Sequence, residues 1–439
     1  MTFRRRQVLG LSLAAPFALA LKPAQAAGRA DVSREVLLTW HKLILELVRH
    51  TATYMPPVAA RGFAYIGVTA HEALATGNPA LLSLAGQLTE LAAVPARDAA
   101  EFDEPCVLHA ALETAVKAHF ANTGPTGQRS MQKMSEIMGK TASEGIATDI
   151  VDRSVAHGRA VASHILAWAA SDGGAVIDNM GFPRDYTPGS RPQDWVPTTL
   201  IRLQQAPLLP DWGKNRPFAM PDTASLDAPP PPDYDEAPES AFYGFAQEVV
   251  ETGRSLTDEQ KLIARFWSDD AMLTPTPAGH WISIVLQIAE RDALPVEVIA
   301  PTLAKLGVAQ ADAFISCWST KFKYNLLRPV TYIKRLIDPK WEPLLITPPF
   351  PEYTSGHSTQ SGAASTVLTA IFGENFAFED ATFEDEGLPV RQFASFAAAA
   401  EEAAVSRLYG GIHFSFGNEA GLVQGRRIGA FAASLRTTA

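Results

Sequence analysis

Apolar residues recur every three or four positions over most of the first 170 residues of the chain. Four stripes of this kind lie at residues 36–48, 63–74, 108–116 and 146–165. Such a repeat places one broad apolar face on an α-helix, because successive turns bring these positions to the same side. The pattern predicts a first bundle of helices over residues 27–170.

The helical pattern stops after residue 170, and Gly, Pro, Asp and Trp accumulate over residues 171–239. This stretch contains Trp195, Trp212 and the proline run 229–232. A segment this long without periodicity is either a linker or a functional covering loop. Because tryptophan side chains favour burial, we predict a covering loop over residues 171–240 that packs on the protein.

Helical signals return in the second half of the chain. Thr257 and Gln260 form the signature of a capping box, and apolar helical patterns follow at residues 281–289 and 296–327. No stretch alternates convincingly between apolar and polar residues, as a strand would. The predicted fold class is therefore all-α, with two helical bundles joined by a long Pro/Gly/Trp-rich loop and the second bundle over residues 241–439.

Three short polar blocks interrupt the apolar sequence of the second bundle, at residues 321–329, 353–357 and 406–413. Together they supply three cations, a hydroxyl group, a glycine amide and two imidazoles, from Lys321, Arg328, Arg407, Ser355, Gly356, His357 and His413. This set is rich in hydrogen-bond donors, as a tetrahedral or bipyramidal oxyanion requires. The blocks predict an oxyanion-binding active site in the C-terminal bundle.

The first two blocks have a local pattern that suits this purpose. Lys321 and Arg328 lie seven positions apart, so on one helix they would project from the same face, and Pro329 would end or kink that helix. Small residues follow Gly356 and predict the opening of a helix, whose N-terminal amides bind anions. The first block therefore offers two cations and the second offers amide donors.

The third block brings a cation and an imidazole to the same place. Arg407 closes an apolar helical run, and the pair Gly410-Gly411 would turn the chain so that His413 faces back. Taken singly, a cation or a histidine is more often a solvated or structural residue. Three blocks in this order, each with its internal spacing intact, favour a functional site.

The order and spacing of the blocks resemble the phosphatidic acid phosphatase type 2 superfamily, whose pattern is Lys-x6-Arg-Pro, Ser-Gly-His and Ser-Arg-x5-His-x3-Asp. This superfamily unites acid and lipid phosphatases with vanadium-dependent haloperoxidases. One departure concerns the last position, because four residues past His413 this chain has Gly417 in place of the usual Asp. A backbone carbonyl, Asn418 or Glu419 could then accept the hydrogen bond from the second imidazole nitrogen.

In the haloperoxidase hypothesis, the resemblance implies vanadate as the cofactor, with His413 bound to vanadium. The vanadate oxygens would be held by Lys321, Arg328, Ser355, the Gly356 amide and Arg407. His357 would take a proton from hydrogen peroxide, and Lys321 would polarise the bound peroxide for attack by chloride or bromide. The product would be a hypohalous acid, and phosphate would compete for the same site.

Two other hypotheses stay open. In an acid phosphatase, the same residues would hold a phosphoryl group, His413 would attack phosphorus and His357 would protonate the leaving alcohol. In a non-catalytic relative, the site would only bind phosphate or vanadate. Trp318 and Phe350 favour the haloperoxidase, because chloroperoxidases of the fungal type are similar at both positions and use these aromatics at the halide site. The alternative is that Trp318 and Phe350 are ordinary core residues.

Residues 1–26 are predicted to be an export signal and no part of the fold. Arg4-Arg5-Arg6 precede an apolar run that ends at Leu21, and Ala24-Gln25-Ala26 forms a small-x-small cleavage site. This arrangement is typical of twin-arginine signal peptides. We therefore expect a periplasmic or secreted protein.

Charge and cysteine content restrict the partners further. The signal segment holds four basic and no acidic residues, so its removal changes the formal net charge from −10 to −14. This acidic balance argues against nucleic acid and anionic membranes as partners. No later stretch is a charge-free apolar run of bilayer length, so we expect no membrane span in the mature chain. Cys106 and Cys317 are too few for a disulfide framework, and we expect free buried thiols.

Overall fold

The computed structural model describes residues 28–177, 182, 186–199, 205–223 and 226–439, and the predicted export signal lies outside these residues. The described chain is mostly helical, which confirms the all-α prediction. The helices before the long loop are α1 (Arg29–Arg49), α2 (Pro56–Ala75), α3 (Glu104–His119), α4 (Pro125–Ser143) and α5 (Thr148–Ala170). Two short elements lie within the loop region, α6 (Gly174–Ile177) and the 3-10 helix η2 (Trp212–Lys214).

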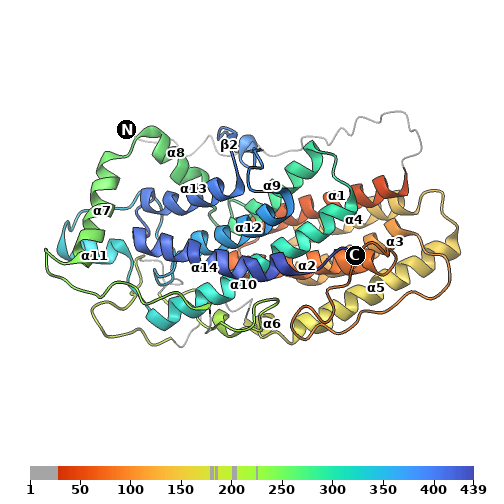
Figure 1. Ribbon diagram of the computed structural model, residues 1–439, viewed down its shortest axis with the longest axis horizontal. Helices are drawn as coiled ribbons and strands as arrows, with labels where there is room; N and C mark the ends of the chain where they lie inside the picture. Colours follow the sequence, from red (N-terminus) through yellow and green to blue (C-terminus); the bar gives the residue numbers. More distant parts are fainter. Residues whose placement is uncertain (1–27, 178–181, 183–185, 200–204, 224–225) are drawn as a thin grey trace.

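The second group of helices carries the predicted site. Its members are α7 (Ala241–Ser255), α8 (Asp258–Phe266), α9 (Thr276–Arg291), α10 (Val296–Tyr324), α11 (Pro329–Leu336), α12 (Gly356–Phe372), α13 (Phe396–Tyr409) and α14 (Ser415–Ser434). Helix α8 begins with the predicted capping box, in which the side chains of Thr257 and Gln260 each bond the other's backbone amide. Figure 1 shows α1–α5 toward one end of an elongated molecule and α7, α8 and α11 toward the other.

Helix α10 joins the two groups of helices. It packs against α2 of the first group and against α12 and α14 of the second. A Cβ on Gly307 of α10 would lie 2.8 Å from the Cα of Ala64, so the two backbones meet directly where α10 crosses α2. One hydrophobic core consequently contains buried residues from Val36 near the start of the chain to Leu435 near its end.

The length and composition of α10 bear on the expectation that the mature chain has no membrane span. Among the described residues, α10 is the helix that is long and apolar enough to cross a membrane by length and composition, with a mean hydropathy of 1.3 in its most apolar window. However, 89% of that window is buried inside the protein. A central core helix has this composition because it is surrounded by other helices on all sides.

The described part of residues 171–240 packs on the helices. The side chains of Trp195 and Trp212 are both buried. The backbone amides of residues 218–220 donate to the carboxylate of Asp312 on α10, at 2.6, 2.8 and 2.9 Å. These contacts attach the described part of the loop to the central helix beside the predicted site.

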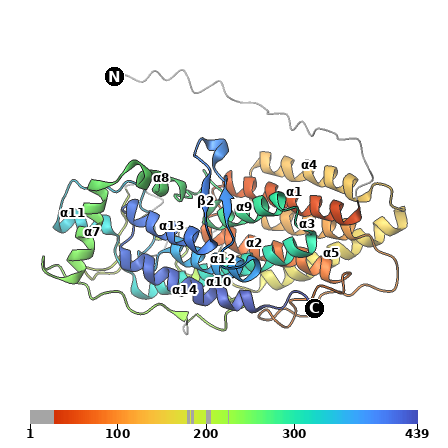
Figure 2. The same ribbon diagram turned by 45° about the horizontal axis from the view of Figure 1, so that its top comes forward.

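Two short strands were not predicted. Strands β1 (Phe378–Asp380) and β2 (Arg391–Phe393) pair in antiparallel register and are connected through the short 3-10 helix η4 (Glu384–Glu386) (Figure 2). Three residues per strand are too few for an alternating pattern to be recognised. Strand β1 nevertheless matters for the site, because it carries the buried Asp380.

Candidate functional site

The first polar block lies at a break between two helices, which corrects the prediction of a single helix. Helix α10 ends at Tyr324, and Asn325 follows in the left-handed conformation with φ 49°. Arg328 is then the N-cap residue of α11, and Pro329 is its first residue. Lys321 and Arg328 therefore belong to different elements, although both side chains are fully buried.

The second and third blocks adopt the predicted local structures. Ser355 is the N-cap of α12, where its hydroxyl accepts from the amide of Ser358, and Gly356 opens the helix. The amides of a first helical turn lack partners within the helix, so they are available to an anion. Helix α13 ends at Tyr409, and Gly411 turns the chain with φ 74°. His413 consequently stands in the short connection between α13 and α14.

Lys321 is held by two backbone carbonyls. Its Nζ donates to the carbonyl oxygens of Pro351 at 2.8 Å and Glu352 at 2.9 Å. An ammonium group has three protons, so one remains for a ligand. Burial, with a smaller contribution from the charge of Arg328, lowers the pKa of Lys321 to about 7, although Cys317 and Glu352 act in the opposite direction. A bound anion would offset this loss of hydration.

The two arginines are buried in the same way. Arg328 donates from Nε to the carbonyl of Phe350 at 2.8 Å and from Nη1 to that of Ile412 at 2.9 Å. Its Nη2 is buried without a hydrogen-bond partner among the described residues. Arg407 donates to the Ser406 hydroxyl and to the carbonyl of Ala264. Burial lowers the pKa of each guanidinium to about 10, still far above neutral pH.

A cavity of about 330 Å³ opens beside these groups. Gly356, His357, Arg407 and His413 line it, together with both predicted halide-site aromatics, Trp318 and Phe350. Lys321, Arg328 and Ser355 are not part of the lining surface, and all three are fully buried. The remaining lining is mainly apolar and includes Met55, Phe182, Leu208, Phe314, Ile346 and Pro348.

The carboxylate of Glu352 lies beside His413. Its Oε1 lies 2.8 Å from His413 Nδ1 and also accepts from the backbone amide of Phe414 at 3.1 Å. The sequence had pointed to a backbone carbonyl, Asn418 or Glu419, and these expectations were wrong. Glu352 was missed because it precedes His413 by 61 residues, and only the chain path brings the two together.

The other nitrogen of His413 faces a cation. Arg328 Nη1 lies 3.0 Å from His413 Nε2. A guanidinium can only donate, so Nε2 carries the lone pair and Nδ1 carries the proton. Burial, followed by the charges of Arg328, Lys321 and Arg407, lowers the pKa of His413 well below its usual value. The imidazole is therefore neutral, with a lone pair on Nε2 that can bind a metal.

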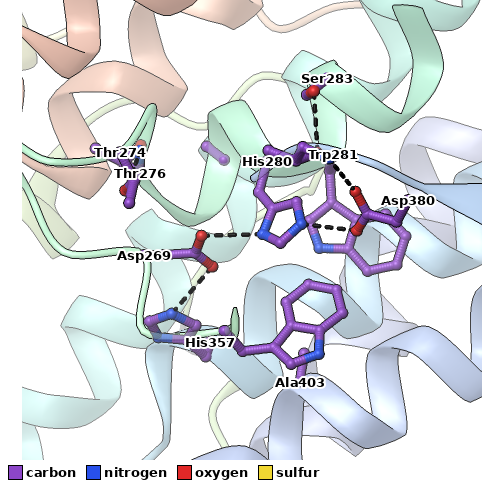
Figure 3. Close-up of polar contacts among 12 residues, drawn as sticks. Asp269, Thr274, Thr276, His280, Trp281, Ser283, His357, Asp380 and Ala403 are labelled. Atoms are coloured by element: carbon purple, nitrogen blue, oxygen red, sulfur yellow. Dashed lines mark hydrogen bonds and ion pairs between the residues drawn. The ribbon is translucent and has the colours of Figure 1, made fainter. Parts of the chain in front are cut away.

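His357 begins a buried chain of alternating carboxylates and imidazoles (Figure 3). Its Nε2 lies 3.5 Å from Asp269 Oδ2, and Asp269 Oδ1 lies 2.9 Å from His280 Nδ1. The chain ends where His280 Nε2 lies 2.8 Å from Asp380 Oδ2. Trp267 stacks on the ring of His280 with a centroid distance of 4.5 Å. Asp269, His280 and Asp380 come from the α8–α9 loop, α9 and β1.

The ionisable groups in this buried series of carboxylates and imidazoles shift one another's pKa values. Burial by itself lowers the pKa of His280, but Asp269 and Asp380 outweigh it and raise the pKa to about 10. Burial raises the pKa of Asp269, but His280 and His357 outweigh it, so the pKa falls below its usual range. For His357, burial and the charge of Arg407 lower the pKa to about 4. A neutral imidazole thus lies beside an ionised carboxylate.

The two aromatics are partners in one small cluster. The rings of Trp318 and Phe350 are 5.0 Å apart, and Lys321 Nζ lies 5.1 Å from the centre of the Phe350 ring. Trp318 Nε1 donates to the carbonyl of Leu208 in the covering loop at 3.1 Å. The indole N–H is therefore already bonded, and the rings offer the cavity an apolar wall.

Sequence reasoning missed Glu352, Asp269 and His280. Each has a weak signal, namely an acid between aromatic and proline residues, an acid pair after Trp267, and a histidine in an apolar helix. None of these signals indicates which side chain the residue contacts in the fold. In the fold, the three residues connect to the two predicted imidazoles, so the site is larger than its motif.

The helical fold places three buried cations, two neutral imidazoles and a helix N-terminus around one cavity. This arrangement defines a protein built to bind an oxyanion. Residues 302–438 match the family model of the VCPO second helical-bundle domain. Vanadium chloroperoxidase from Curvularia inaequalis is 30% identical over 166 residues, which cover 32% of this chain. The match spans only 27% of that longer protein.

Two solved structures resemble nearly the whole chain. The first bacterial vanadium-dependent iodoperoxidase is 37% identical, with a TM-score of 0.85 over 92% of this chain and 97% of that one. An apo-type bacterial vanadium-dependent chloroperoxidase is 16% identical, with a TM-score of 0.69 over 88% of this chain and 94% of that one, which shows the fold alone. This chain belongs to the vanadium-dependent haloperoxidase family, whose cofactor is vanadate.

The residues present fit vanadate. None of the three buried cations forms an ion pair with a carboxylate within the described ranges, and Arg328 Nη2 lacks any hydrogen-bond partner there. Burial of a cation without a counter-charge costs several kcal/mol per ion, by order of magnitude. A bound oxyanion supplies that counter-charge, and the lone pair of His413 supplies a metal ligand.

Proposed function

We propose that this protein oxidises halide ions with hydrogen peroxide to hypohalous acid, using vanadate bound at His413. The observation that carries the proposal is the convergence of unpaired buried cations and a neutral, oriented His413 on a cavity with an apolar wall. Bound vanadate acts as a Lewis acid that activates peroxide toward attack by a halide.

The cations and the start of α12 would hold the cofactor. Lys321, Arg328 and Arg407 would donate charge-assisted hydrogen bonds to its oxygens, and Ser355 and the Gly356 amide would add donors at the helix N-terminus. His413 would be the metal ligand through Nε2, since Nδ1 is directed to Glu352. Several donors already in place need no reorganisation during the reaction.

His357 is proposed to accept a proton from hydrogen peroxide. Its Nε2 lies 3.5 Å from the ionised Asp269, which can only accept, so in this proposal Nε2 carries the proton and the lone pair is on Nδ1. The low pKa of about 4 keeps this imidazole neutral at neutral pH. Asp269 then stabilises the imidazolium that forms.

The aromatic wall supports halide oxidation over phosphate-ester hydrolysis. Trp318 and Phe350 line the cavity next to His357 and His413, and a weakly hydrated halide tolerates such a surface. The similarity to an iodoperoxidase over nearly the whole chain points the same way and makes iodide the first halide to test. Chloride and bromide, as first expected, are tested beside it.

The cellular location of the protein is also a proposal. The twin-arginine signal at residues 1–26 supports export to the periplasm or beyond. There the enzyme would encounter hydrogen peroxide and halide from outside the cell. Residues 1–26 fused to a reporter should direct export, and replacement of Arg4, Arg5 and Arg6 by Lys should prevent it.

The test of the reaction compares two activities. Protein freed of anions is loaded with orthovanadate and assayed with peroxide and each halide, while the vanadate-free form is assayed for hydrolysis of phosphate monoesters. We expect vanadate-dependent halide oxidation that His413→Ala abolishes and His357→Ala strongly reduces. Phosphate should compete with vanadate for loading.

Vanadate inhibition of a phosphatase decides nothing, because the same residues hold both anions. The two rates must therefore be compared. Efficient ester hydrolysis without oxidation of any halide would show that the protein is a phosphatase. Tight vanadate binding without either activity would show a non-catalytic oxyanion binder.

A further inference from the structure

The carboxylate beside His413 does not come from the position where the superfamily pattern has it. That pattern places Asp four residues after the histidine, on the following helix, and this chain has Gly417 there. Glu352 occupies the corresponding space from the other side, on the segment that leads into α12.

We propose that Glu352 is the positioning residue that holds His413 in its Nδ1-protonated form and presents Nε2 to vanadate, and that Gly417 makes room for it. The proposal rests on the proposed function in one respect, that His413 is the vanadium ligand. Glu352 itself acts through His413, since its bonds are to Nδ1 and to the Phe414 amide.

The space around Glu352 admits only one such carboxylate. A Cβ built on Gly417 would lie 2.3 Å from Oε1 of Glu352, far inside the contact distance of carbon and oxygen. Gly417 lies in the first turn of α14 and is not among the glycines with positive φ. Its backbone conformation therefore does not itself require glycine, and the three heavy atoms nearest to the added Cβ all belong to Glu352.

Glu352 is held firmly enough to orient another residue. Its amide donates to the carbonyl of Leu326 at 2.9 Å, and its own carbonyl accepts from Lys321 at 2.9 Å. Two residues before Glu352, the carbonyl of Phe350 accepts from Arg328 at 2.8 Å. The segment 350–352 thus fixes two cations through its backbone and the metal ligand through a side chain.

The neighbouring polar residues do not compete for this role. Asn418 Oδ1 lies 3.5 Å from the Ser358 hydroxyl, and Glu419 points to solvent. Glu419 is therefore a matched control, an acid two positions from Gly417 on the same helix. Its replacement by Gln should change neither the tautomer of His413 nor the binding of anions.

The first experiment measures the tautomer directly in protein without vanadate. In the ¹⁵N NMR spectrum of the imidazole, His413 of the wild type should show a protonated Nδ1. Glu352→Ala should weaken this preference, because only the bond from Arg328 to Nε2 then favours it, and Glu352→Gln should keep it, because its amide oxygen still accepts from Nδ1. Gly417→Ala should also weaken it, because the new methyl group displaces the carboxylate while Glu352 remains.

The second experiment measures binding and tests whether the carboxylate can be moved. Glu352→Ala should weaken orthovanadate binding by about 10–100-fold, the usual effect of removing the partner of a ligating histidine. Gly417→Asp alone should also weaken it, through the clash. The double variant Glu352→Ala/Gly417→Asp should bind vanadate more tightly than either single variant and regain the Nδ1 signal.

Two results would overturn the proposal. One is an unchanged His413 tautomer and unchanged affinity in both Glu352→Ala and Gly417→Ala, each shown to be folded by circular dichroism. The other is a folded double variant that binds no better than Glu352→Ala. Neither readout uses halide oxidation, so a wild type that binds vanadate without oxidising halide would refute the proposed reaction and leave this inference standing.

Discussion

At the scale of single residues, the site depends on buried cations that form no ion pair with a carboxylate among the residues that the structure describes. The low pKa values of Lys321, Arg328 and Arg407 express the cost of burying these cations. An oxyanion reduces that cost when it binds, because it forms charge-assisted hydrogen bonds with all of them. Anion affinity and the protonation of these groups are therefore linked.

Arg407→Ala should weaken vanadate and phosphate binding together by about 1.5–3 kcal/mol for each hydrogen bond to the anion that is lost. Arg407 is chosen of the two arginines because it lines the cavity, whereas Arg328 does not. Calorimetry measures both affinities. Lys323→Ala is the control, because Lys323 pairs with Asp227 and is half-exposed. Equal affinities in wild type and Arg407→Ala would remove the oxyanion site.

The affinity of the anion-free protein for phosphate should also depend on Lys321 and pH. With its pKa lowered to about 7, Lys321 loses its proton as the pH rises through that value, and one cation of the site disappears. Phosphate itself ionises in the same range, so wild type is compared with Lys321→Met at each pH. The advantage of wild type should shrink above about pH 7. A constant ratio of the two affinities would contradict this assignment.

At the scale of elements, helix ends and connections place the functional groups. The start of α12 supplies Ser355 and Gly356, and the turn after α13 supplies His413. The α8–α9 loop supplies Asp269, which adopts φ 49°, while His280 and Asp380 lock that loop to α9 and β1. The α8–α9 loop, α9 and β1 are therefore held together by the buried imidazole of His280.

His280→Gln should destabilise the protein by roughly 3–5 kcal/mol, the range for breaking a buried ion pair. The pKa of His280 is raised from 6.5 to about 10 by folding, so its stabilisation is complete below pH 6.5 and is lost as the pH rises through about 10. Urea unfolding at about pH 6 and about pH 9 should show a larger loss in wild type than in the variant. Equal losses in both proteins would mean that His280 is neutral in the fold.

At the scale of the whole molecule, one core connects the first and second groups of helices. Helices α2 and α10 meet at glycines, because Cβ atoms on Gly67 and Gly307 would each lie 2.8 Å from a backbone atom of the other helix. The site stands on α10 and on the elements that follow it. Its geometry therefore depends on packing against the N-terminal half.

Gly307→Ala should lower the free energy of unfolding by about 1–3 kcal/mol, since the added methyl group forces the two helices apart. Far-ultraviolet circular dichroism and tryptophan fluorescence should still report one coincident transition. Gly244→Ala in α7 is the control, because nothing lies within 4 Å of its added Cβ. It should be neutral or stabilise by about 0.4–1 kcal/mol. Separate transitions for the two probes would refute the shared core.

The sequence by itself determined the helical class, the packed loop and the donors of the three polar blocks. These features are local, because a helical face, a capping box or the turn at Gly410-Gly411 is specified by residues a few positions apart. The predicted helix over residues 296–327 failed at its end, where Asn325 takes a left-handed conformation and sends Arg328 to the next helix.

Only the tertiary structure decided which side chains of the site contact one another. Glu352 contacts His413 although 61 residues separate them in the sequence. Asp269 links His357 to His280 and, through it, to strand β1, and no sequence motif contains these residues together. The local pattern showed that Gly417 lacks a carboxylate, but the reason for the glycine lies in the space that Glu352 fills. Hydrogen-bond partners and excluded volume depend on distances in space, and spacing along the chain does not contain them.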